Sequence, residues 1–309
     1  MDYKQRTLNE EIGCTGIGLH TGEKIRITMR PAPCDTGIRF VRTDLPQSPM
    51  IEARFDNVFD TTLATTIGSN GTRVSTIEHL MAAFYGLGID NAVVGLDGPE
   101  VPIMDGSSAP FVLLIKSVGI REQEKAKRFI VVKKPFKVDD GDRSISVYPS
   151  KELRINYMID FQHPLLRNQA YEMSFSGGAF VREISRARTF GFLKDVQTLK
   201  DNGLAKGGSL DNAVVMDDFR ILNEDGLRFK DEFVRHKILD FLGDLSLIQS
   251  PVIGRFEVRK SGHFLNQEML TGLMRSKKHW KVFEFKTPEE CTNNSVRIPA
   301  FGLPEAAAA

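Results

Sequence analysis

The sequence contains few cysteines and no long apolar run. Cys14, Cys34 and Cys291 are the only three cysteines among 309 residues. Their odd number and wide spacing exclude a disulfide framework and a zinc knuckle, so we expect free thiols in a reducing compartment. The most apolar short run, 111–115, stops at Lys116, far short of the length that spans a bilayer. We therefore expect no transmembrane segment.

An excess of charge of one sign is also absent. Lys and Arg total 41 against 40 acidic residues, which leaves no global field to attract nucleic acid or an anionic membrane. Residues 1–6 lead into polar sequence without an apolar signal region. Apolar and charged fractions of 41% and 26% are ordinary for a globular protein. We expect a cytoplasmic protein that does not bind nucleic acid.

Alternation of apolar and polar residues predicts several half-buried strands. Ile25, Ile27 and Met29 alternate with polar neighbours, and the same pattern recurs over 153–161 and 171–175. Such alternation is typical of sheets with one face packed and one face solvated.

Two segments have helical patterns, and a charged run separates them. The first helix is predicted over about 76–85, before Gly86 and Gly88, where left-handed caps are expected. The second is predicted over about 231–248, with one apolar stripe. The run 121–128 is dense in charge, and we interpret it as a solvated connection that marks a domain boundary.

The two halves of the chain show signs of an internal duplication. A shift of 157 positions lays His79 on His236 and Gly86 on Gly243, in comparable helical contexts. A second internal match relates 89–94 to 210–215, but its offset differs. One match must be coincidental, and we expect it to be the second. Each half is then one unit of helices packed on a sheet.

His236 and Asp240 lie one helical turn apart, on the same side of the second helix. A neutral imidazole and a carboxylate so placed can bind one divalent ion. A third ligand from elsewhere would leave an open position for water, as in catalytic zinc sites. The alternative is a hydrogen-bonded pair on the surface, and spacing alone favours that alternative.

Glu78 directly precedes His79 in the first helix. Adjacent helical residues point about 100° apart, so one could ligate a metal while the other reaches over the bound water. The alternative is structural, because Ser75 and Glu78 have the spacing of a capping box. Spacing alone favours capping.

Further polar residues accompany these two helices. Lys237 and Asp244 share a side with Asp240, although a charged row is usually only the solvated face of a helix. Residues 261–263 follow an alternating strand and are predicted to form a strand-to-loop corner, a common place for functional side chains. The alternative for His263 is a turn histidine bonded to backbone.

Six segments together resemble one known family. They are LHTG (19–22), STIEHL (75–80), PIMDGS (102–107), SRARTFGF (185–192), FVRHKILD (233–240) and KSGH (260–263). They look like the signatures of the UDP-3-O-acyl-N-acetylglucosamine deacetylases of lipid A synthesis, in family order from near residue 13 to past residue 266. The resemblance covers nearly the whole chain except its tail.

The resemblance implies roles for individual residues. The zinc ligands, for one Zn2+ per chain, would be His79, His236 and Asp240. The residues of the reaction would be Glu78 as general base, His263 as general acid or electrostatic partner, Asp244 as the carboxylate that orients it, and Thr189 as the oxyanion donor. The residues that handle the nucleotide sugar would be Lys237, Phe161, Asp195, Arg143 and Lys260. Position 143 is Arg where some relatives have Lys.

The resemblance also implies an α+β fold of two similar domains, each packing helices against β-sheets. The first would cover 1–125 and carry Glu78 and His79, and the second would cover 126–290. A strand-helix-strand insert at about 190–215 would form the wall of an acyl-chain passage. Its apolar residues are Phe190, Phe192, Leu199, Leu204 and Ala205, for which a small core of the insert itself is the alternative. The C-terminal tail is placed at 291–309. Its poorly patterned part, from Ile298 onward, is predicted to be disordered and to be a protease recognition segment.

The implied function is zinc-dependent hydrolysis of the N-acetyl group of UDP-3-O-(3-hydroxyacyl)-N-acetylglucosamine. The reaction releases acetate and is the committed step of lipid A synthesis. Two alternatives stay open. One is another zinc amidohydrolase, such as a peptidase, although the chain has no His-Glu-x-x-His helix. The other is a nucleotide-sugar binding protein without catalytic activity.

Overall fold

Two five-stranded sheets form the outer layers of the molecule in the computed structural model, which describes residues 2–287, 290 and 296–301. The first sheet has the order β2 (Ile12–Ile17), β3 (Lys24–Pro31), β9 (Ala92–Leu96), β4 (Ile38–Arg42) and β5 (Met50–Glu52). The second has the order β12 (Phe136–Asp140), β13 (Arg143–Tyr148), β19 (Arg255–Arg259), β14 (Arg154–Ile159) and β15 (Gln169–Ser174).

The two sheets have the same topology. In the first, β9 pairs parallel with β4, and every other pairing is antiparallel. In the second, β19 pairs parallel with β14, and again every other pairing is antiparallel. In each sheet the central strand comes late in its half of the chain, after a helix. This strand is β9, after residues 78–87, in the first sheet and β19, after residues 232–245, in the second. The predicted duplication and the α+β fold class are confirmed.

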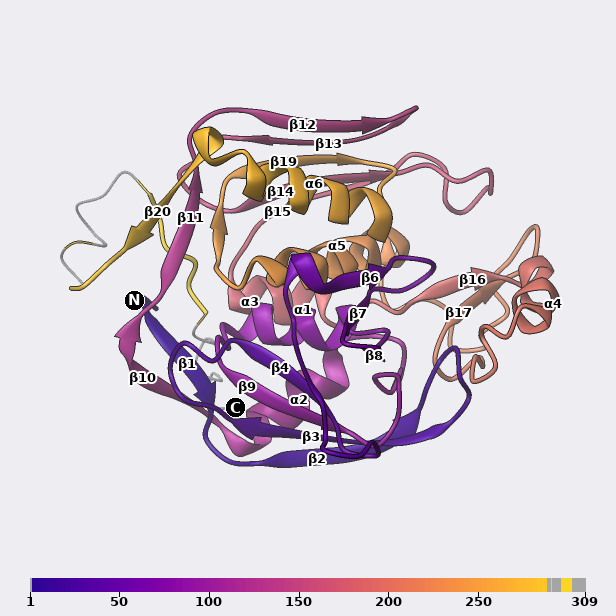
Figure 1. The fold of residues 1–309 in the computed structure, drawn as a ribbon. Helices are drawn as coiled ribbons and strands as arrows, with labels where there is room; N and C mark the ends of the chain where they lie inside the picture. The colour runs from indigo at the N-terminus through magenta and orange to yellow at the C-terminus, as the bar shows by residue number, and fades with distance from the viewer. Residues whose placement is uncertain (1, 288–289, 291–295, 302–309) are drawn as a thin grey trace, which may run out of the picture.

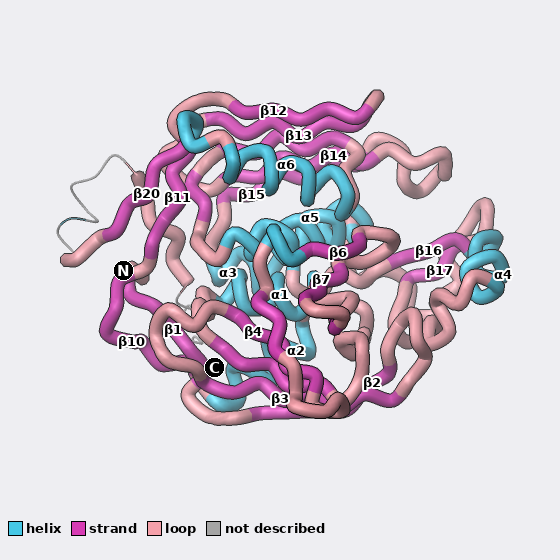
Figure 2. Tube along the Cα trace, in the orientation of Figure 1, coloured by secondary structure: helices cyan, strands magenta, loops and turns pink. Residues whose placement is uncertain are grey.

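Helices fill the space between the sheets (Figures 1 and 2). The main ones are α1 (Glu78–Leu87), α2 (Ala109–Val118), α5 (Glu232–Leu245), which runs on into a 3-10 turn at Ser246–Ile248, and α6 (His263–Arg275). The order of layers is sheet, helices, helices, sheet, with α1 and α5 in contact at the centre. The predicted helix over 231–248 is confirmed. The first helix begins two residues later than predicted.

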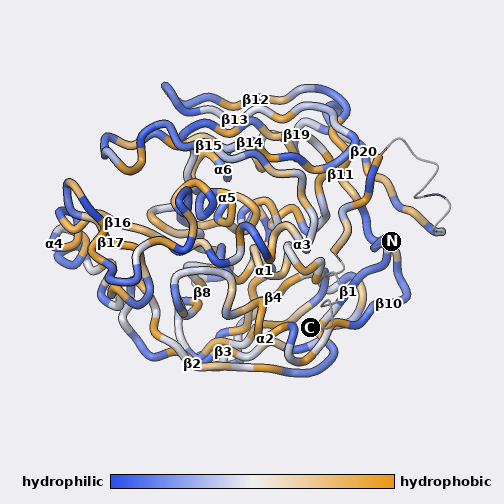
Figure 3. The backbone as a smooth tube through the Cα atoms, turned by 180° about the vertical axis from the view of Figure 1, so that it is seen from behind, coloured by the Kyte–Doolittle hydropathy of each residue, from blue (hydrophilic) through white to orange (hydrophobic). Residues whose placement is uncertain are grey.

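The alternating strands turn their apolar residues toward these helices. Ile25, Ile27 and Met29 of β3 are fully buried, and Ile155 and Tyr157 of β14 are buried in the same way. Figure 3 shows hydrophobic stretches gathered where helices and sheets meet and hydrophilic residues at hairpin tips. Burial of one face of each sheet is the main source of the stability that holds α1 against α5.

The insert of the second half has the predicted strand-helix-strand order. It consists of β16 (Phe190–Phe192), α4 (Leu193–Asp201) and β17 (Val214–Met216), and its two strands are parallel. It projects to one side of the layers (Figure 1). The match between 89–94 and 210–215 relates the central strand β9 to the insert strand β17. These strands occupy different places in the fold, so this match is coincidental, as expected.

Smaller elements complete the described chain. Three short strands, β6 (Val58–Asp60), β7 (Thr66–Ser69) and β8 (Thr72–Val74), precede α1. A second small sheet contains β11 (Arg128–Val132), β18 (Val252–Ile253) and β20 (Trp280–Glu284). The remaining turns of helix are Phe55–Asn57, α3 (Gly177–Ala179), a π-type turn at Phe180–Ile184, and Lys277–His279.

The charged run at 121–128 is mostly solvated, as predicted, and it has regular structure. Most of it forms the strand β10 (Ile120–Ala126), which pairs antiparallel with β1 (Lys4–Leu8). Charged side chains are compatible with a strand whose outer face is solvated, and they protect a sheet edge from further pairing. Lys127, directly after β10, is buried and forms an ion pair with Asp90. The domain boundary at 125 stays a prediction.

Part of the predicted disordered tail is packed on the body of the protein. Phe301 is buried, its ring centroid lies 6.0 Å from that of Phe175, and the Gly177 amide donates to the Ala300 carbonyl at 2.7 Å. The prediction of disorder is therefore wrong for 298–301. Residues 291–295, which include Cys291, and 302–309 lie outside the described residues.

Across the described residues, every helix is too short or too polar to cross a bilayer.

Candidate active site

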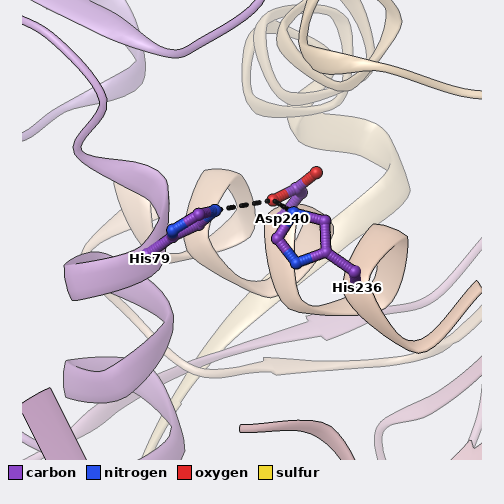
Figure 4. A group of neighbouring side chains, drawn as sticks. All are labelled: His79, His236 and Asp240. Carbon is purple, nitrogen blue, oxygen red and sulfur yellow. Dashed lines mark ion pairs between the residues drawn. The ribbon is translucent and has the colours of Figure 1, made fainter. Parts of the chain in front are cut away.

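The three predicted metal ligands meet where α1 contacts α5 (Figure 4). His79 comes from α1, and His236 and Asp240 come from one side of α5. The Nε2 atoms of His79 and His236 lie 3.5 and 3.2 Å from Oδ1 of Asp240. One ligand atom from each residue lies within 4.8 Å of the others. The prediction that two distant helices bring these side chains together is confirmed.

The donor set suits a zinc ion. Within the described part of the chain, Asp240 Oδ1 is buried without a hydrogen-bond partner, which is costly unless a cation binds there. Nδ1 of His236 lies 3.0 Å from the Ala187 carbonyl, so donation to that oxygen leaves Nε2 free to ligate. All three residues are at most 4% exposed. The alternative of a surface His-Asp pair is therefore wrong.

The protonation states also suit metal binding. Burial lowers the pKa of His236 to about 3, which keeps the imidazole neutral. Burial works against ionised Asp240, but charged neighbours such as the Lys237 ammonium outweigh it and hold its pKa well below the ordinary value. Neutral imidazole and ionised carboxylate are the forms that ligate zinc.

Glu78 does not cap the helix that it begins, so the capping-box interpretation is wrong. The residue before α1 is Ile77, and α1 has no side-chain cap. The Glu78 carboxylate instead turns inward, where its Oε2 accepts a 3.0 Å hydrogen bond from the Thr65 amide. Burial raises the pKa of Glu78 above its ordinary value. A carboxylate with a raised pKa is a stronger base than an exposed one.

The backbone before α1 explains why the box fails to form. Thr76 has a φ of 57°, in the left-handed region that β-branched residues rarely adopt. Its hydroxyl donates to Oε1 of the fully buried Glu100 at 2.9 Å. The chain therefore turns sharply before Ile77, and Ser75 lies too far back to cap α1.

His263 is the first residue of α6 and not part of a loop, which corrects the predicted strand-to-loop corner. Its Nδ1 lies 2.9 Å from Oδ2 of Asp244, and its Nε2 lies 3.7 Å from Oε1 of Glu78. Asn266, one turn along α6, donates to the same Asp244 oxygen at 2.8 Å. His263 thus pairs with a carboxylate, and the alternative of a turn histidine bonded to backbone is wrong.

The neighbours of His263 favour its charged form. Burial would lower the pKa of this imidazole, but the Asp244 and Glu78 carboxylates outweigh burial and raise it to about 9. These carboxylates favour the imidazolium, in which Nδ1–H donates to Asp244 and Nε2–H faces Glu78. Asp244 is buried on α5, so the alternative of a solvated charged row is also wrong.

The segment that carries Thr189 is held from two sides. The Thr189 amide donates to the Gly106 carbonyl at 2.8 Å, which ties the segment to the first half of the chain. The neighbouring Arg188 is buried and donates through Nε to Oε1 of Glu232, the fully buried first residue of α5, at 2.9 Å. The Ala187 carbonyl in the same segment faces His236. The segment 187–189 therefore positions both Thr189 and the His236 imidazole.

A cavity of about 630 Å³ brings most of the predicted site residues together. The predicted residues among its lining are Glu78, His79, Arg143, Phe161, Thr189, Phe190, Phe192, Asp195, Leu199, His236, Lys237, Asp240 and His263. Asp244, Lys260, Leu204 and Ala205 are not among the described residues that line it. Asp244 lies behind His263, and the imidazole of His263 stands between this carboxylate and the cavity.

The predicted cations near the cavity all have acidic partners. Lys237 is half-buried and donates to Oδ2 of Asp240 at 2.8 Å. Lys260 forms ion pairs of 2.8 and 3.0 Å with Asp142 and Asp160. An anion at this rim would compete with those two carboxylates for Lys260.

Aromatic rings line the side of the cavity toward the insert. The ring centroid of Phe161 lies 5.8 Å from that of Phe190, at an interplanar angle of 88°, and 6.2 Å from that of Phe192. Phe190 also packs edge-on against the buried Phe233 at 5.0 Å. The insert rings thus join the cavity wall, and a separate small core of the insert does not account for them.

Sequence reasoning missed several residues of the site. Leu63 and Phe264 line the cavity although their side chains are 53% and 57% exposed. Large exposed apolar side chains at a cavity are a signal for an apolar ligand, but that exposure is visible only in the structure. Thr65 and Asn266 were also missed, because an isolated threonine or asparagine carries no spacing signal.

Comparison with known proteins agrees with this geometry. Residues 5–275 match the family model LpxC, UDP-3-O-acyl N-acetylglycosamine deacetylase. The chain belongs to this family. A UDP-3-O-acyl-N-acetylglucosamine deacetylase of Saccharophagus degradans is 53% identical over 288 residues, which cover 93% of this chain and 95% of the relative. A deacetylase of the same description from Myxococcus xanthus is 55% identical over 272 residues, which cover 88% and 87%. The LpxC match spans both sheets, α1, α5 and the insert.

Proposed function

We propose that this chain is a zinc-dependent deacetylase that hydrolyses the N-acetyl group of UDP-3-O-(3-hydroxyacyl)-N-acetylglucosamine, the committed step of lipid A synthesis. The observation that carries the proposal is the buried group His79, His236 and Asp240, which opens onto the same cavity as Glu78 and His263. Membership of the LpxC family supports the substrate. The cytoplasmic location and protease recognition of the tail stay predictions.

The metal ligands would be His79, His236 and Asp240, which leave the cavity side open. A zinc ion with three protein ligands supplies Lewis acidity and makes a coordinated water acidic, with a pKa of about 7. Lys237 holds the second oxygen of Asp240 and thereby fixes the carboxylate plane.

Glu78 is the general base of the proposed reaction. It takes a proton from the attacking water as the water adds to the acetyl carbonyl carbon. Its raised pKa brings its basicity closer to what neutral pH requires. The Thr65 amide occupies Oε2, so Oε1 is the oxygen available for the proton.

His263 and Thr189 act on the charges that develop next. The Thr189 hydroxyl donates to the oxyanion of the tetrahedral intermediate. Protonated His263, oriented by Asp244, offsets negative charge and gives a proton to the leaving amine as the C–N bond breaks. The products are acetate and the free amino sugar.

The rest of the cavity supports recognition of the substrate at its two ends. Phe161 offers an aromatic face for the uracil, and Arg143 and Lys237 on the cavity wall offer positive charge for the diphosphate. Lys260 lies outside the described lining and would offer its charge from beside the cavity. Asp195 lines the cavity on the insert side, where a sugar hydroxyl could donate to it. Phe190 and Phe192 form the apolar wall for the acyl chain, with about 0.8 kcal/mol for each methylene buried.

An acetate-release assay with metal analysis tests the proposal. The purified protein is given the UDP-linked acylated sugar and, separately, a panel of N-acetylated peptides. We expect about one zinc per chain and acetate release from the UDP-sugar alone. Release from peptides would favour another amidohydrolase. Tight binding of the UDP-sugar without turnover and without stoichiometric metal would favour a binding protein.

A further inference from the structure

Thr65 lies at the centre of the hydrogen bonds that hold the reacting side chains, although it belongs to none of the six family-like segments. It precedes β7 and is 2% exposed. Its amide donates to Oε2 of Glu78 at 3.0 Å, and its hydroxyl donates to Oδ1 of Asp244 at 2.5 Å. The same hydroxyl oxygen lies 3.1 Å from Nδ1 of His263. One residue thus contacts α1, α5 and α6.

The hydroxyl completes the binding of Asp244. Oδ2 of that carboxylate already accepts from His263 and Asn266, and Oδ1 accepts from Thr65. With donors on both oxygens, the carboxylate cannot rotate without losing a charge-assisted hydrogen bond. Because Nδ1–H of His263 points at this carboxylate, the plane of Asp244 sets the direction of Nε2 toward the cavity.

The backbone of Thr65 makes hydrogen bonds at the start of α1, where a capping box would have made them. Its carbonyl accepts from the Ile77 amide at 3.3 Å, and its amide holds Glu78 Oε2. Glu78 is therefore fixed as a base with Oε1 turned toward His263. The backbone contacts persist in any side-chain variant, so a substitution at Thr65 isolates the role of the hydroxyl.

We propose that Thr65 is a positioning residue that links the general base Glu78 to the His263–Asp244 pair and sets their relative orientation. This inference rests on the proposed deacetylation. The hydroxyl need not touch substrate, because Thr65 is not among the described residues that line the cavity. It acts through Asp244 and His263, as outer hydrogen-bond partners do in other metal sites.

Thr65→Val tests the hydroxyl with almost no change of volume. We expect kcat to fall about 10- to 100-fold, with a change of KM below about 2-fold and an unchanged zinc content. Thr65→Ser keeps the donor and should retain kcat within about 3-fold. The matched control is Thr66→Val, because Thr66 is buried and makes no side-chain hydrogen bond within the described chain. It should leave kcat unchanged.

A double-mutant cycle separates positioning from general loosening of the core. In an Asp244→Ala background, Thr65→Val should reduce kcat by less than about 3-fold, because the acceptor that the hydroxyl holds is gone. Equal losses in both backgrounds, full activity of Thr65→Val, or failure of serine to rescue would each overturn the proposal.

Histidine nitrogen NMR keeps this inference separable from the proposed function. In 15N-histidine-labelled protein, Thr65→Val should shift the Nδ1–H signal of His263, whereas Thr66→Val should not. Identical spectra would overturn the positioning role of Thr65. Absence of acetate release by the wild-type protein would instead overturn the proposed function, while the spectra would still report whether Thr65 orients His263.

Discussion

Gly243 of α5 lies directly against the backbone of Glu78. A Cβ atom at Gly243 would stand 2.1 Å from the Glu78 carbonyl oxygen, far inside van der Waals contact. The duplicate position, Gly86 of α1, is equally close to its neighbour, since a Cβ there would stand 2.1 Å from the ring of Phe180. Glycine at both positions lets the helices approach closely. The approach at Gly243 is what brings His236 and Asp240 opposite His79.

We therefore expect Gly243→Ala to damage both stability and metal binding. The methyl group meets backbone, which cannot rotate away, so the helices must separate, at about 1–3 kcal/mol of unfolding free energy or more. Zinc affinity, measured by competition with a chromogenic chelator, should fall together with the urea midpoint.

The matched control for that variant is Gly272→Ala in α6. A Cβ at Gly272 would stand 2.8 Å from the far end of the Phe136 ring, a side chain that can shift. Alanine also favours helix by about 1 kcal/mol over glycine. This variant should bind zinc normally. Normal zinc affinity in Gly243→Ala would contradict the role of close helix approach.

The site could be predicted from local rules only where its residues lie close together in the sequence. His236 and Asp240 are one turn apart, and helical periodicity alone places them on one side. Their burial depends on α1, which is more than 140 residues earlier in the sequence. Local rules therefore favoured a surface pair. Several strands and the helix over 231–248 were easier to predict, because alternation and an apolar stripe are local signals. The α+β fold of two similar domains was predicted from the resemblance of the six segments to a known family.

The capping-box rule failed because tertiary contacts overrode it. A capping box was expected at Ser75, but the bond from Thr76 to Glu100 turns the chain away and the Thr65 amide takes the Glu78 carboxylate. Thr65 itself reaches Asp244 and His263 across 179 and 198 positions of sequence. No periodicity or spacing rule connects residues so far apart.

Glu78→Gln should abolish deacetylation without unfolding the protein. The amide oxygen can still accept from Thr65, and Glu78 does not cap α1, so the structural loss is small. Loss of the base should lower kcat by about 10²- to 10⁴-fold. Acetate release, zinc content and thermal melting are measured together. Retained activity would eliminate Glu78 as the base, and a large fall in melting temperature would restore a structural role.

The pH dependence of kcat/KM should have a basic limb set by His263. Asp244 and Glu78 raise the pKa of this imidazole to about 9, against the effect of burial. The protonated acid is thus present below that pH and is lost as pH rises through it, so kcat/KM should fall above about pH 9. Asp244→Asn removes one of the stabilising charges and should move the limb to lower pH. A limb that stays in place would assign it to another group.

Arg188→Met should destabilise the protein more than most core substitutions. Glu232 is fully buried and would keep its charge without its guanidinium partner, at a cost of about 3–5 kcal/mol. Adding Glu232→Gln removes that charge while keeping an acceptor for the Arg188 amide, so the double variant should unfold at a higher urea concentration than Arg188→Met alone.

The same variant should also lower kcat, because Ala187 and Thr189 flank Arg188 and face His236 and the cavity. If the double variant recovers stability but not kcat, the pair contributes to the geometry of the site in addition to the fold. A charge isolated at the start of α5 must be neutralised or solvated before the helix can pack. Equal unfolding midpoints for Arg188→Met and the wild-type protein would therefore contradict the argument from burial.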